Sequence, residues 1–215
     1  MISRTNKFIA FEGIDGAGKS TQLRILSQRL AKMGQECHET AEPTSGMVGS
    51  LIRQIMSYKI EADNKVTAGL FVADRLDHLL NESNGILEKV KNGVAVLTDR
   101  YYFSSYAYQG IFMPMEWVIQ ANALSAEILR PTVNIFIDVN PKVAAQRINN
   151  RRDIELYETL DTLTKIREQY FIAFETIGKD ENVIIVDGNQ SLEKVADDIW
   201  EAVADIFTYY PCTEI

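Results

Sequence analysis

The stretch "FEGIDGAGKS", residues 11 to 20, decides how the whole chain is interpreted. It follows a short apolar run and precedes a segment of helical period. It fits the pattern G-x-x-x-x-G-K-[ST] with four residues in register: Gly13, Gly18, Lys19 and Ser20. Glycines let a backbone turn its N–H groups around phosphate oxygens, and the next helix presents its positive N-terminus to the same charge. The stretch therefore predicts a P-loop rather than a glycine-rich turn that only joins a strand to a helix.

Two residues of this loop have predicted chemical roles. Lys19 would reach the terminal phosphates of ATP, and the Ser20 hydroxyl would ligate Mg²⁺, the expected cofactor. The predicted ATP-binding residues are the loop and the helix start, namely Gly13, Gly16, Ala17, Gly18, Lys19, Ser20 and Thr21.

Short apolar runs alternate with longer helical stretches along the chain. Strands are expected at residues 8–11, 36–40, 94–98, 133–139 and 183–186. Helices are expected near residues 19–33, 48–57, 64–81, 86–91, 115–129, 142–149, 156–177 and 192–207. The alternation predicts an α/β fold with a five-stranded parallel sheet and helices on both faces. Ligands gather beyond the carboxyl ends of such strands, where three unusual stretches fall: residues 13–21, 42–46 and 99–110.

Composition limits the organisation of the chain and its partners. No linker, repeat or low-complexity segment divides the 215 residues, so a single domain, 1–215, is expected. A net charge of -8 gives no overall positive field for a nucleic-acid polymer or an anionic membrane. No stretch approaches the roughly 18 apolar residues of a spanning helix. Cys37 and Cys212 lack metal-ligand spacing and fit free thiols, so a cytoplasmic location is expected.

The apolar run in "VAVLTDR" ends on Asp99 and Arg100. Asp99 is in a Walker-B-like position for a carboxylate near Mg²⁺. A metal-binding carboxylate alone suits a hydrolase or a switch, whereas the adjacent arginine could grip a second anion with its forked donors. The alternative is an Asp-Arg pair that simply faces solvent.

Several further stretches occur in the order typical of one family. They are "FEGIDGAGKST", "EPT" with "GSLIR", "LFVADR", "DRYYFSSYAYQG" and the arginine-rich "RINNRRD". From residue 7 to about 170 the chain resembles the thymidylate kinases, and "VIIVDGNQSLEKV" is similar to their last strand and helix. The resemblance implies transfer of the γ-phosphoryl group of ATP to dTMP in dTTP synthesis. It also implies a P-loop kinase core, a short lid at about residues 147–158, and a homodimer.

In "LFVADR", Phe71 and Arg75 are four residues apart and share one face of a helix. An aromatic ring and a forked donor suit a flat base, with Phe71 stacking and Arg75 bonding a carbonyl edge. By resemblance this pair reads thymine. Taken alone, Phe71 in the core and a solvated or ion-paired Arg75 would be the simpler interpretation.

The stretch "DRYYFSSYAYQG" would begin a helix with polar residues at four-residue spacing, Arg100 with Ser104 and Ser105 with Gln109. By resemblance, Arg100 takes the acceptor phosphate while Ser105 and Gln109 reach the base edge. Tyr108 is placed to lie under the sugar, where it would crowd out a ribose 2′-OH. The remaining tyrosines are expected in the core.

A carboxylate within the P-loop needs a donor or must turn away from phosphates, and the resemblance gives Asp15 the 3′-OH of the acceptor. A solvated loop aspartate is the alternative. By resemblance, Arg53 would face the acceptor phosphate side, near Glu42 and Pro43 of the "EPT" loop, with its target left open; a solvated arginine on the outer helix face is the alternative. Related bacterial enzymes commonly read T-R-E-P, but this chain has Ala41 where they have arginine. Glu42 could then orient Arg100, Arg53 or a water molecule.

Phosphoryl transfer needs positioned cations, which "QRINNRRD" offers as Arg147, Arg151 and Arg152. In the family a catalytic arginine comes from the P-loop or the lid. Gly16 occupies the P-loop position here, so the lid is expected to supply it. A solvated basic helix end is the alternative for each arginine.

Three competing functions remain at the level of sequence. Another nucleoside monophosphate kinase would share the P-loop and the lid. A GTP-dependent switch would need a guanine-reading N-K-x-D tetrapeptide, and none is present. A non-catalytic nucleotide-binding subunit is disfavoured by the intact Lys19, Ser20 and Asp99.

Overall fold

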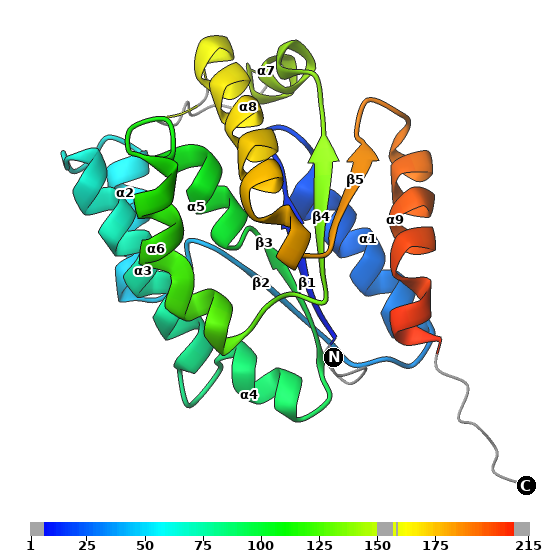
Figure 1. Cartoon of the computed structure of the whole chain (residues 1–215). Helices are drawn as coiled ribbons and strands as arrows, with labels where there is room; N and C mark the ends of the chain where they lie inside the picture. The colour runs from blue at the N-terminus through cyan, green and yellow to red at the C-terminus, as the bar shows by residue number, and fades with distance from the viewer. Residues whose placement is uncertain (1–6, 150–156, 158, 209–215) are drawn as a thin grey trace, which may run out of the picture.

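A computed structural model describes residues 7–149, 157 and 159–208 of the chain. Its sheet has five parallel strands in the order β2-β3-β1-β4-β5 (Figure 1). The strands are β1 Phe8–Glu12, β2 Cys37–Ala41, β3 Ala95–Asp99, β4 Val133–Asp138 and β5 Val183–Asp187. All five lie where the apolar runs predicted them, which confirms the parallel α/β fold.

Helices cover both faces of this sheet, as predicted (Figure 1). Helix α1 packs beside α9 on one face, while α5 packs against α6 and α8 on the other, with α3 beside α5 and α6. The helices are α1 Lys19–Lys32, α2 Met47–Met56, α3 Asn64–Leu80, α4 Ile86–Lys91, α5 Tyr102–Gln109, α6 Met115–Ile128, α7 Pro141–Asn149, α8 Leu160–Ile177 and α9 Leu192–Phe207, with a 3₁₀ turn, η1, at Gly178–Asp180.

Helix α8 begins later than the predicted residue 156. Thr159 is its N-cap, and its side-chain oxygen accepts a hydrogen bond from the Thr162 N–H at 3.2 Å. A threonine that satisfies an otherwise unpaired N–H in this way fixes where a helix starts. Periodicity alone could not locate this boundary, because the apolar pattern extends further towards the N-terminus.

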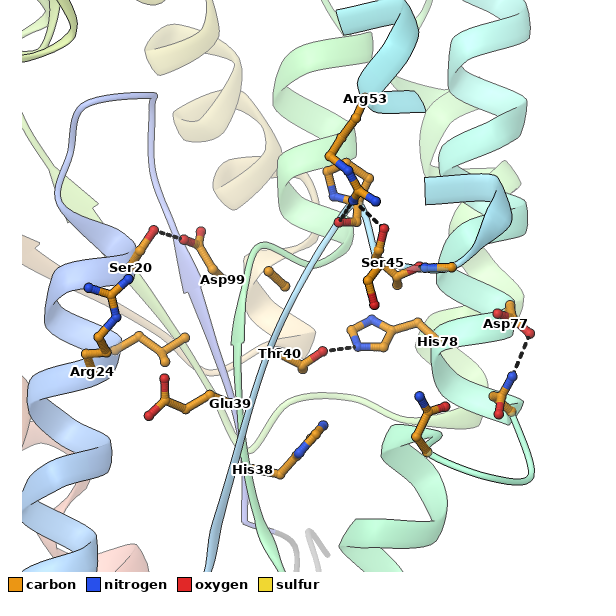
Figure 2. Close-up of a pocket in the computed structure, with 17 residues that line it drawn as sticks. Ser20, Arg24, His38, Glu39, Thr40, Ser45, Arg53, Asp77, His78 and Asp99 are labelled. Atoms are coloured by element: carbon orange, nitrogen blue, oxygen red, sulfur yellow. Dashed lines mark hydrogen bonds between the residues drawn. The ribbon is translucent and has the colours of Figure 1, made fainter. Parts of the chain in front are cut away.

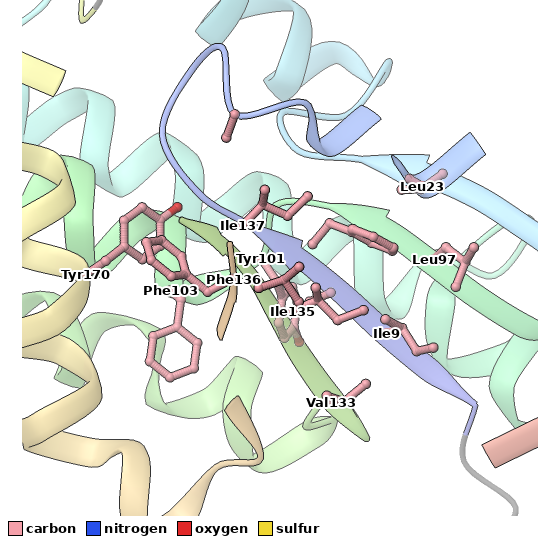
Figure 3. Packing of buried hydrophobic residues seen from close by; sticks show 14 of the residues in the cluster. Ile9, Leu23, Leu97, Tyr101, Phe103, Val133, Ile135, Phe136, Ile137 and Tyr170 are labelled. Carbon is pink, nitrogen blue, oxygen red and sulfur yellow. The ribbon is translucent and has the colours of Figure 1, made fainter. Parts of the chain in front are cut away.

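The central strand β1 is buried along its whole length because it has a neighbour on each side and helices on both faces. On the α8 side, the Phe136 ring on β4 packs 4.8 Å from the Tyr170 ring and 5.1 Å from the Phe174 ring (Figure 3). Phe103 on α5 lies 5.1 Å from Phe174. These contacts fix α5 and α8 over the sheet and hold Tyr170 near the end of β1.

Strands β1 and β3 stay paired up to the loops that follow them. Phe11 on β1 is in register with Asp99 on β3, and the Arg100 N–H donates to the Phe11 carbonyl at 2.9 Å. The P-loop, the Glu42–Gly46 loop and the segment from Arg100 therefore leave the same edge of the sheet, as the sequence predicted.

Two features expected from the sequence, the lid and Cys212, lie mainly outside the described residues. Of the expected lid, the structure places Arg147 and Tyr157, but Arg151 and Arg152 fall in the undescribed segment. Cys212 is also undescribed, whereas Cys37 is a free thiol. Within the described residues, no helix has both the length and the apolar character needed to cross a membrane.

Candidate active site

The P-loop has the backbone that its glycines were expected to allow. Gly16 and Gly18 have φ angles of 79° and 95°, which disfavour any other residue. A Cβ on Gly16 would lie 2.6 Å from the Ala144 carbonyl oxygen, so a side chain is also excluded there by space. The buried Lys19 folds back over the loop, where its Nζ donates to the Ile14 carbonyl at 3.1 Å. Burial and the charge of Arg100 hold the pKa of Lys19 below its ordinary value.

Ser20 and Asp99 form the expected oxygen pair at the start of α1. The Ser20 hydroxyl donates to Asp99 Oδ2, as Figure 2 shows. The other carboxylate oxygen of Asp99 is buried and has no hydrogen-bond partner among the described residues. A hydroxyl beside a carboxylate with an open oxygen fits the all-oxygen coordination that Mg²⁺ prefers.

Arg100 joins the end of β3 to the P-loop. Its Nη2 donates to Asp15 Oδ1 at 2.5 Å and to the Tyr108 hydroxyl at 2.8 Å, and its Nη1 donates to Ser104 Oγ at 3.0 Å. Tyr108 in turn donates to Asp15 Oδ2 at 2.8 Å. Burial opposes ionisation of Asp15, but the charges of Arg100 and Lys19 outweigh it and hold the pKa of Asp15 below its usual range. Asp15 is therefore a paired carboxylate rather than a solvated loop residue.

The backbone of Arg100 is strained, with a φ of 76°, and a buried carboxylate holds it in place. Glu12, the last residue of β1, accepts from the Tyr101 N–H at 2.9 Å and from the Ser104 hydroxyl at 2.5 Å. It also accepts from the Tyr170 hydroxyl at 2.9 Å. Burial raises the pKa of Glu12 to about 6, although the Ser104 hydrogen bond and the Arg100 charge partly offset the rise. The sequence did not mark Glu12 as a site residue, because its position looks like the last residue of an ordinary apolar strand.

A cavity of about 190 Å³ lies beside Arg100, between the P-loop, α3 and α5. Its lining includes every residue that the sequence assigned to dTMP binding, together with two that it did not. The lining residues are Asp15, Glu42, Pro43, Arg53, Met56, Phe71, Arg75, Arg100, Ser104, Ser105, Tyr108, Gln109 and Tyr157. The missed residues, Met56 and Tyr157, are apolar or aromatic and carry no sequence signal that separates them from core residues.

Arg75 lines this cavity and is only 1% exposed, so it is not solvated, but it is ion-paired, as the alternative interpretation also allowed. Its Nε donates to Glu42 Oε2 at 2.8 Å, and its Nη2 lies 2.6 Å from the same oxygen. Its Nη1 donates to Ser105 Oγ at 2.9 Å and to the Asn122 side-chain oxygen. Glu42 thus pairs with Arg75, and not with Arg100 or Arg53 as the sequence analysis considered.

Gln109 contributes a second open acceptor. Its side-chain Oε1 is buried in the cavity wall with no hydrogen-bond partner in the described part of the chain. Buried polar atoms are normally paired, so an open acceptor facing a cavity indicates a place for a ligand donor. By contrast, Tyr101, Tyr102 and Tyr106 are buried in the core, as predicted for most of the tyrosines.

The loop after β2 is held against α3. Asp74 accepts from the Thr44 N–H at 2.7 Å and from its hydroxyl at 2.6 Å. Arg53 is exposed and donates to the Pro43 carbonyl at 2.9 Å and to the Thr44 carbonyl. Sequence reasoning did not select Asp74, although its three-residue spacing from Phe71 places it on the side of α3 that faces the site.

On the other side of the P-loop, Arg147 donates to the carbonyls of Gly16 and Gly188, each at 3.2 Å. It borders a hollow of about 290 Å³ whose lining joins the P-loop to the loop after β5. Arg147 is an exposed residue, but these two hydrogen bonds hold its guanidinium against the P-loop. Part of this hollow is lined by residues that follow β5, and no sequence motif in "DGNQSL" had marked them. They are Gly188, Gln190 and Leu192.

A phosphate-binding loop beside a second cavity, with an arginine between them, defines a phosphotransferase of the P-loop kinase class. A family model described as thymidylate kinase matches residues 11–199. The chain belongs to the thymidylate kinase family.

Curated relatives from archaea and bacteria match most of the chain. A "Probable thymidylate kinase" of Pyrobaculum aerophilum is 36% identical over 203 residues, which are 94% of this chain and 98% of that protein. A "Thymidylate kinase" of Thermoanaerobacter sp. is 36% identical over 200 residues, or 92% of this chain and 97% of that protein. A "Thymidylate kinase" of Ligilactobacillus salivarius is 34% identical over 202 residues, or 89% of this chain and 94% of that protein.

Proposed function

We propose that this chain transfers the γ-phosphoryl group of ATP to dTMP, giving dTDP and ADP. The observation that carries the proposal is the position of Arg100, which contacts Asp15 in the P-loop and also lines the acceptor cavity. A guanidinium between a donor loop and a second cavity suits transfer between two phosphates better than hydrolysis. Family membership and the match of the whole cavity lining support dTMP as the acceptor.

At the donor side, backbone N–H groups of the P-loop and the start of α1 would bind the β- and γ-phosphates of ATP, with Lys19 reaching the terminal phosphates. Ser20 and Asp99 would hold Mg²⁺, because the open Asp99 oxygen lies beside the serine hydroxyl. When bound, Mg²⁺ neutralises charge on the phosphates. Arg147, next to Gly16, would face the nucleotide from the other side of the loop.

At the acceptor side, Arg100 would bind the dTMP phosphate, while Asp15 exchanges one present partner for the sugar 3′-OH. Phe71 would stack on thymine, and Arg75 with Ser105 would bind a carbonyl edge. The open Gln109 acceptor suits the N3–H of thymine, which cytosine lacks. Tyr108 would lie against the sugar. Ser104 orients Arg100, and Arg53 with the Glu42–Pro43 loop closes the phosphate side.

In the reaction, an oxygen of the dTMP phosphate forms the bond to the γ-phosphorus as the bond from the γ-phosphorus to the bridging oxygen of ADP breaks. Negative charge spreads over the moving group, so the cations around it stabilise the transition state. Lys19 and Arg100, whose charges act on each other in the structure, would be two of these cations. Arg147, Arg151 and Arg152 remain the candidates for the further catalytic arginine.

We also propose a homodimer formed through α3 and α6. These helices pack side by side and expose large apolar side chains, namely Val66, Leu80, Trp117 and Leu124. Trp117 and Leu124 are seven residues apart and lie on one face of α6. The free thiol of Cys37 supports the further proposal of a reducing, cytoplasmic setting.

The test is ADP formation from ATP and Mg²⁺ with dTMP, dUMP, UMP, dCMP, AMP, GMP or no acceptor. Preference for dTMP that is weakened in Arg75→Ala supports both the reaction and the base site. Preference for another monophosphate would still support a kinase reaction, but it would contradict the assignment of these residues to thymine binding. Hydrolysis without an acceptor, or ATP binding without turnover, would contradict the proposed reaction.

A further inference from the structure

We propose that His78 is a positioning residue for base recognition, which fixes the Glu42 carboxylate and through it the Arg75 guanidinium. The inference rests on the proposed function, since it concerns how Arg75 is presented to thymine. His78 lies on α3, three residues after Arg75, and is 8% exposed. It does not line the acceptor cavity, and neither its sequence context nor a family motif had marked it.

The partners of His78 determine where its ring proton lies. Nδ1 is 3.1 Å from Glu42 Oε1, and an ionised carboxylate only accepts hydrogen bonds, so Nδ1 carries the proton. Nε2 is 2.7 Å from Thr40 Oγ1 and, in the neutral ring, accepts the hydroxyl proton. Figure 2 shows this contact between Thr40 on β2 and His78 on α3. The edge strand thereby orients the imidazole, and the imidazole orients Glu42.

The two oxygens of Glu42 have different partners. Oε1 faces His78, while Oε2 lies 2.8 Å from Arg75 Nε and 2.6 Å from Arg75 Nη2. A carboxylate left to itself favours bidentate pairing, with both oxygens on the guanidinium. The His78 donor occupies one oxygen and opposes that rotation. The guanidinium plane is then set so that Nη1 remains on the Ser105 side of the cavity.

His78 also lies between two cavities, the hollow beside β2 and the acceptor cavity. Thr40 and His78 line a second hollow of about 630 Å³ beside β2 (Figure 2). Glu42 and Arg75 line the acceptor cavity instead. Without the imidazole, the buried Glu42 oxygen would lose its donor and face water from this larger hollow. A buried carboxylate whose partner is lost reorients or pairs elsewhere, which would shift Arg75.

Three substitutions separate the two ring contacts. His78→Asn keeps a donor near the Nδ1 position, His78→Gln places its amide nearer the Nε2 position, and His78→Leu removes both. With native activity on dTMP established first, we expect His78→Leu to raise the KM for dTMP roughly tenfold while kcat and the KM for ATP change less than about twofold. The preference for dTMP over dCMP should fall, because Arg75 reads a carbonyl edge. In His78→Asn, the KM for dTMP and the preference for dTMP over dCMP should both stay close to their native values. In His78→Gln, both should change as they do in His78→Leu.

The comparison of the asparagine and glutamine variants keeps the test decisive if His78→Leu does not fold. Equal kinetics in these two variants would overturn the proposal, as would an unchanged KM and acceptor preference in a folded His78→Leu. Thr40→Val, which removes only the Nε2 partner, should have a smaller effect in the same direction. A native protein inactive on dTMP would instead contradict the proposed function, independently of His78.

Discussion

Arg100 and Asp15 form an ion pair, with 2.5 Å between Nη2 and Oδ1, that links the acceptor-phosphate arginine to the donor loop. The Tyr108 hydroxyl bonds both partners, so the three side chains form one polar cluster at the boundary of the two sites.

Asp15→Asn tests this pair. The amide keeps the shape and one acceptor oxygen, but it removes the charge that pairs with Arg100 and replaces the second carboxylate oxygen with a donor. We expect kcat/KM for dTMP to fall about 10²-fold, because a preorganised charge at a transferring phosphate is lost. The KM for ATP should stay within about twofold. Steady-state ADP formation measures both, and a loss confined to ATP binding would contradict the acceptor role.

Tyr108 is predicted to select deoxyribose over ribose through its ring rather than through its hydroxyl. Tyr108→Phe should weaken dTMP turnover modestly, by about fivefold, since the hydrogen bonds of its hydroxyl with Asp15 and Arg100 are lost. It should retain the preference for dUMP over UMP. Tyr108→Ala opens space for the 2′-OH, so the ratio of kcat/KM for dUMP to that for UMP should fall. An unchanged ratio in Tyr108→Ala would remove Tyr108 from sugar selection.

Asp99→Asn tests the metal assignment. Replacing the carboxylate keeps a partner for Ser20 but removes the negative charge, so the Mg²⁺ concentration for half-maximal activity should rise at least about tenfold. Titration of activity with Mg²⁺ at saturating ATP measures this. Glu39→Gln is a suitable control, because Glu39 lines the same hollow beside β2 without contacting Ser20. Equal shifts in both variants would argue against a ligand role for Asp99.

Glu12 should make stability depend on pH in a direction opposite to that of a paired surface carboxylate. Its pKa is about 6 in the folded protein, above the ordinary value of 4.5, so the folded state holds this proton more tightly than the unfolded chain. The contribution of Glu12 to the free energy of unfolding therefore falls, by about 2 kcal/mol, as pH rises through this interval.

Glu12→Gln lacks this titration. Urea unfolding of both proteins between about pH 4.5 and pH 7 should show native stability declining relative to the variant by that amount. Taking the difference between the proteins cancels the other titrating groups that they share. A difference that stays constant across the range would show that Glu12 does not titrate there.

The proposed dimer is tested on α6. Leu124→Glu places a charge on the exposed apolar face and should shift the mass measured by light scattering from dimer to monomer at micromolar concentration. Leu192→Glu, at the start of α9, is the matched control, because Leu192 is similarly exposed but lies on another helix. A native monomer, or equal behaviour of the two variants, would contradict the α3–α6 interface.

The sequence predicted the sheet well because strands and helices depend on local signals, whereas most residues of the cavity lining were expected from the resemblance to the thymidylate kinases. The P-loop spacing located β1 and α1, and the four-residue spacing of Phe71 and Arg75 placed them on one face of α3. The burial of Arg75 could not be predicted in this way. Its charged partner Glu42 is 33 residues away and Asn122 is 47 residues away, so the pairing exists only after the chain folds.

Glu12 and His78 were missed for a related reason. Each acts on another side chain of the site, and neither occurs in a pattern that distinguishes it from an ordinary strand or helix residue. Glu12 becomes informative only when β3 brings Tyr101 and Ser104 to it, and His78 only when β2 brings Thr40.

The hydrogen bond from Arg100 N–H to the Phe11 carbonyl has a mechanical consequence. Because β1 and β3 remain paired up to Phe11 and Asp99, the donor loop and the acceptor arginine are attached to the same rigid part of the sheet and cannot slide past each other. Any change in the gap between the two phosphates must come from side-chain motion or from helices outside the sheet. Substitutions in the β1 core, such as Ile9→Ala, should therefore disturb ATP and dTMP binding together instead of one at a time.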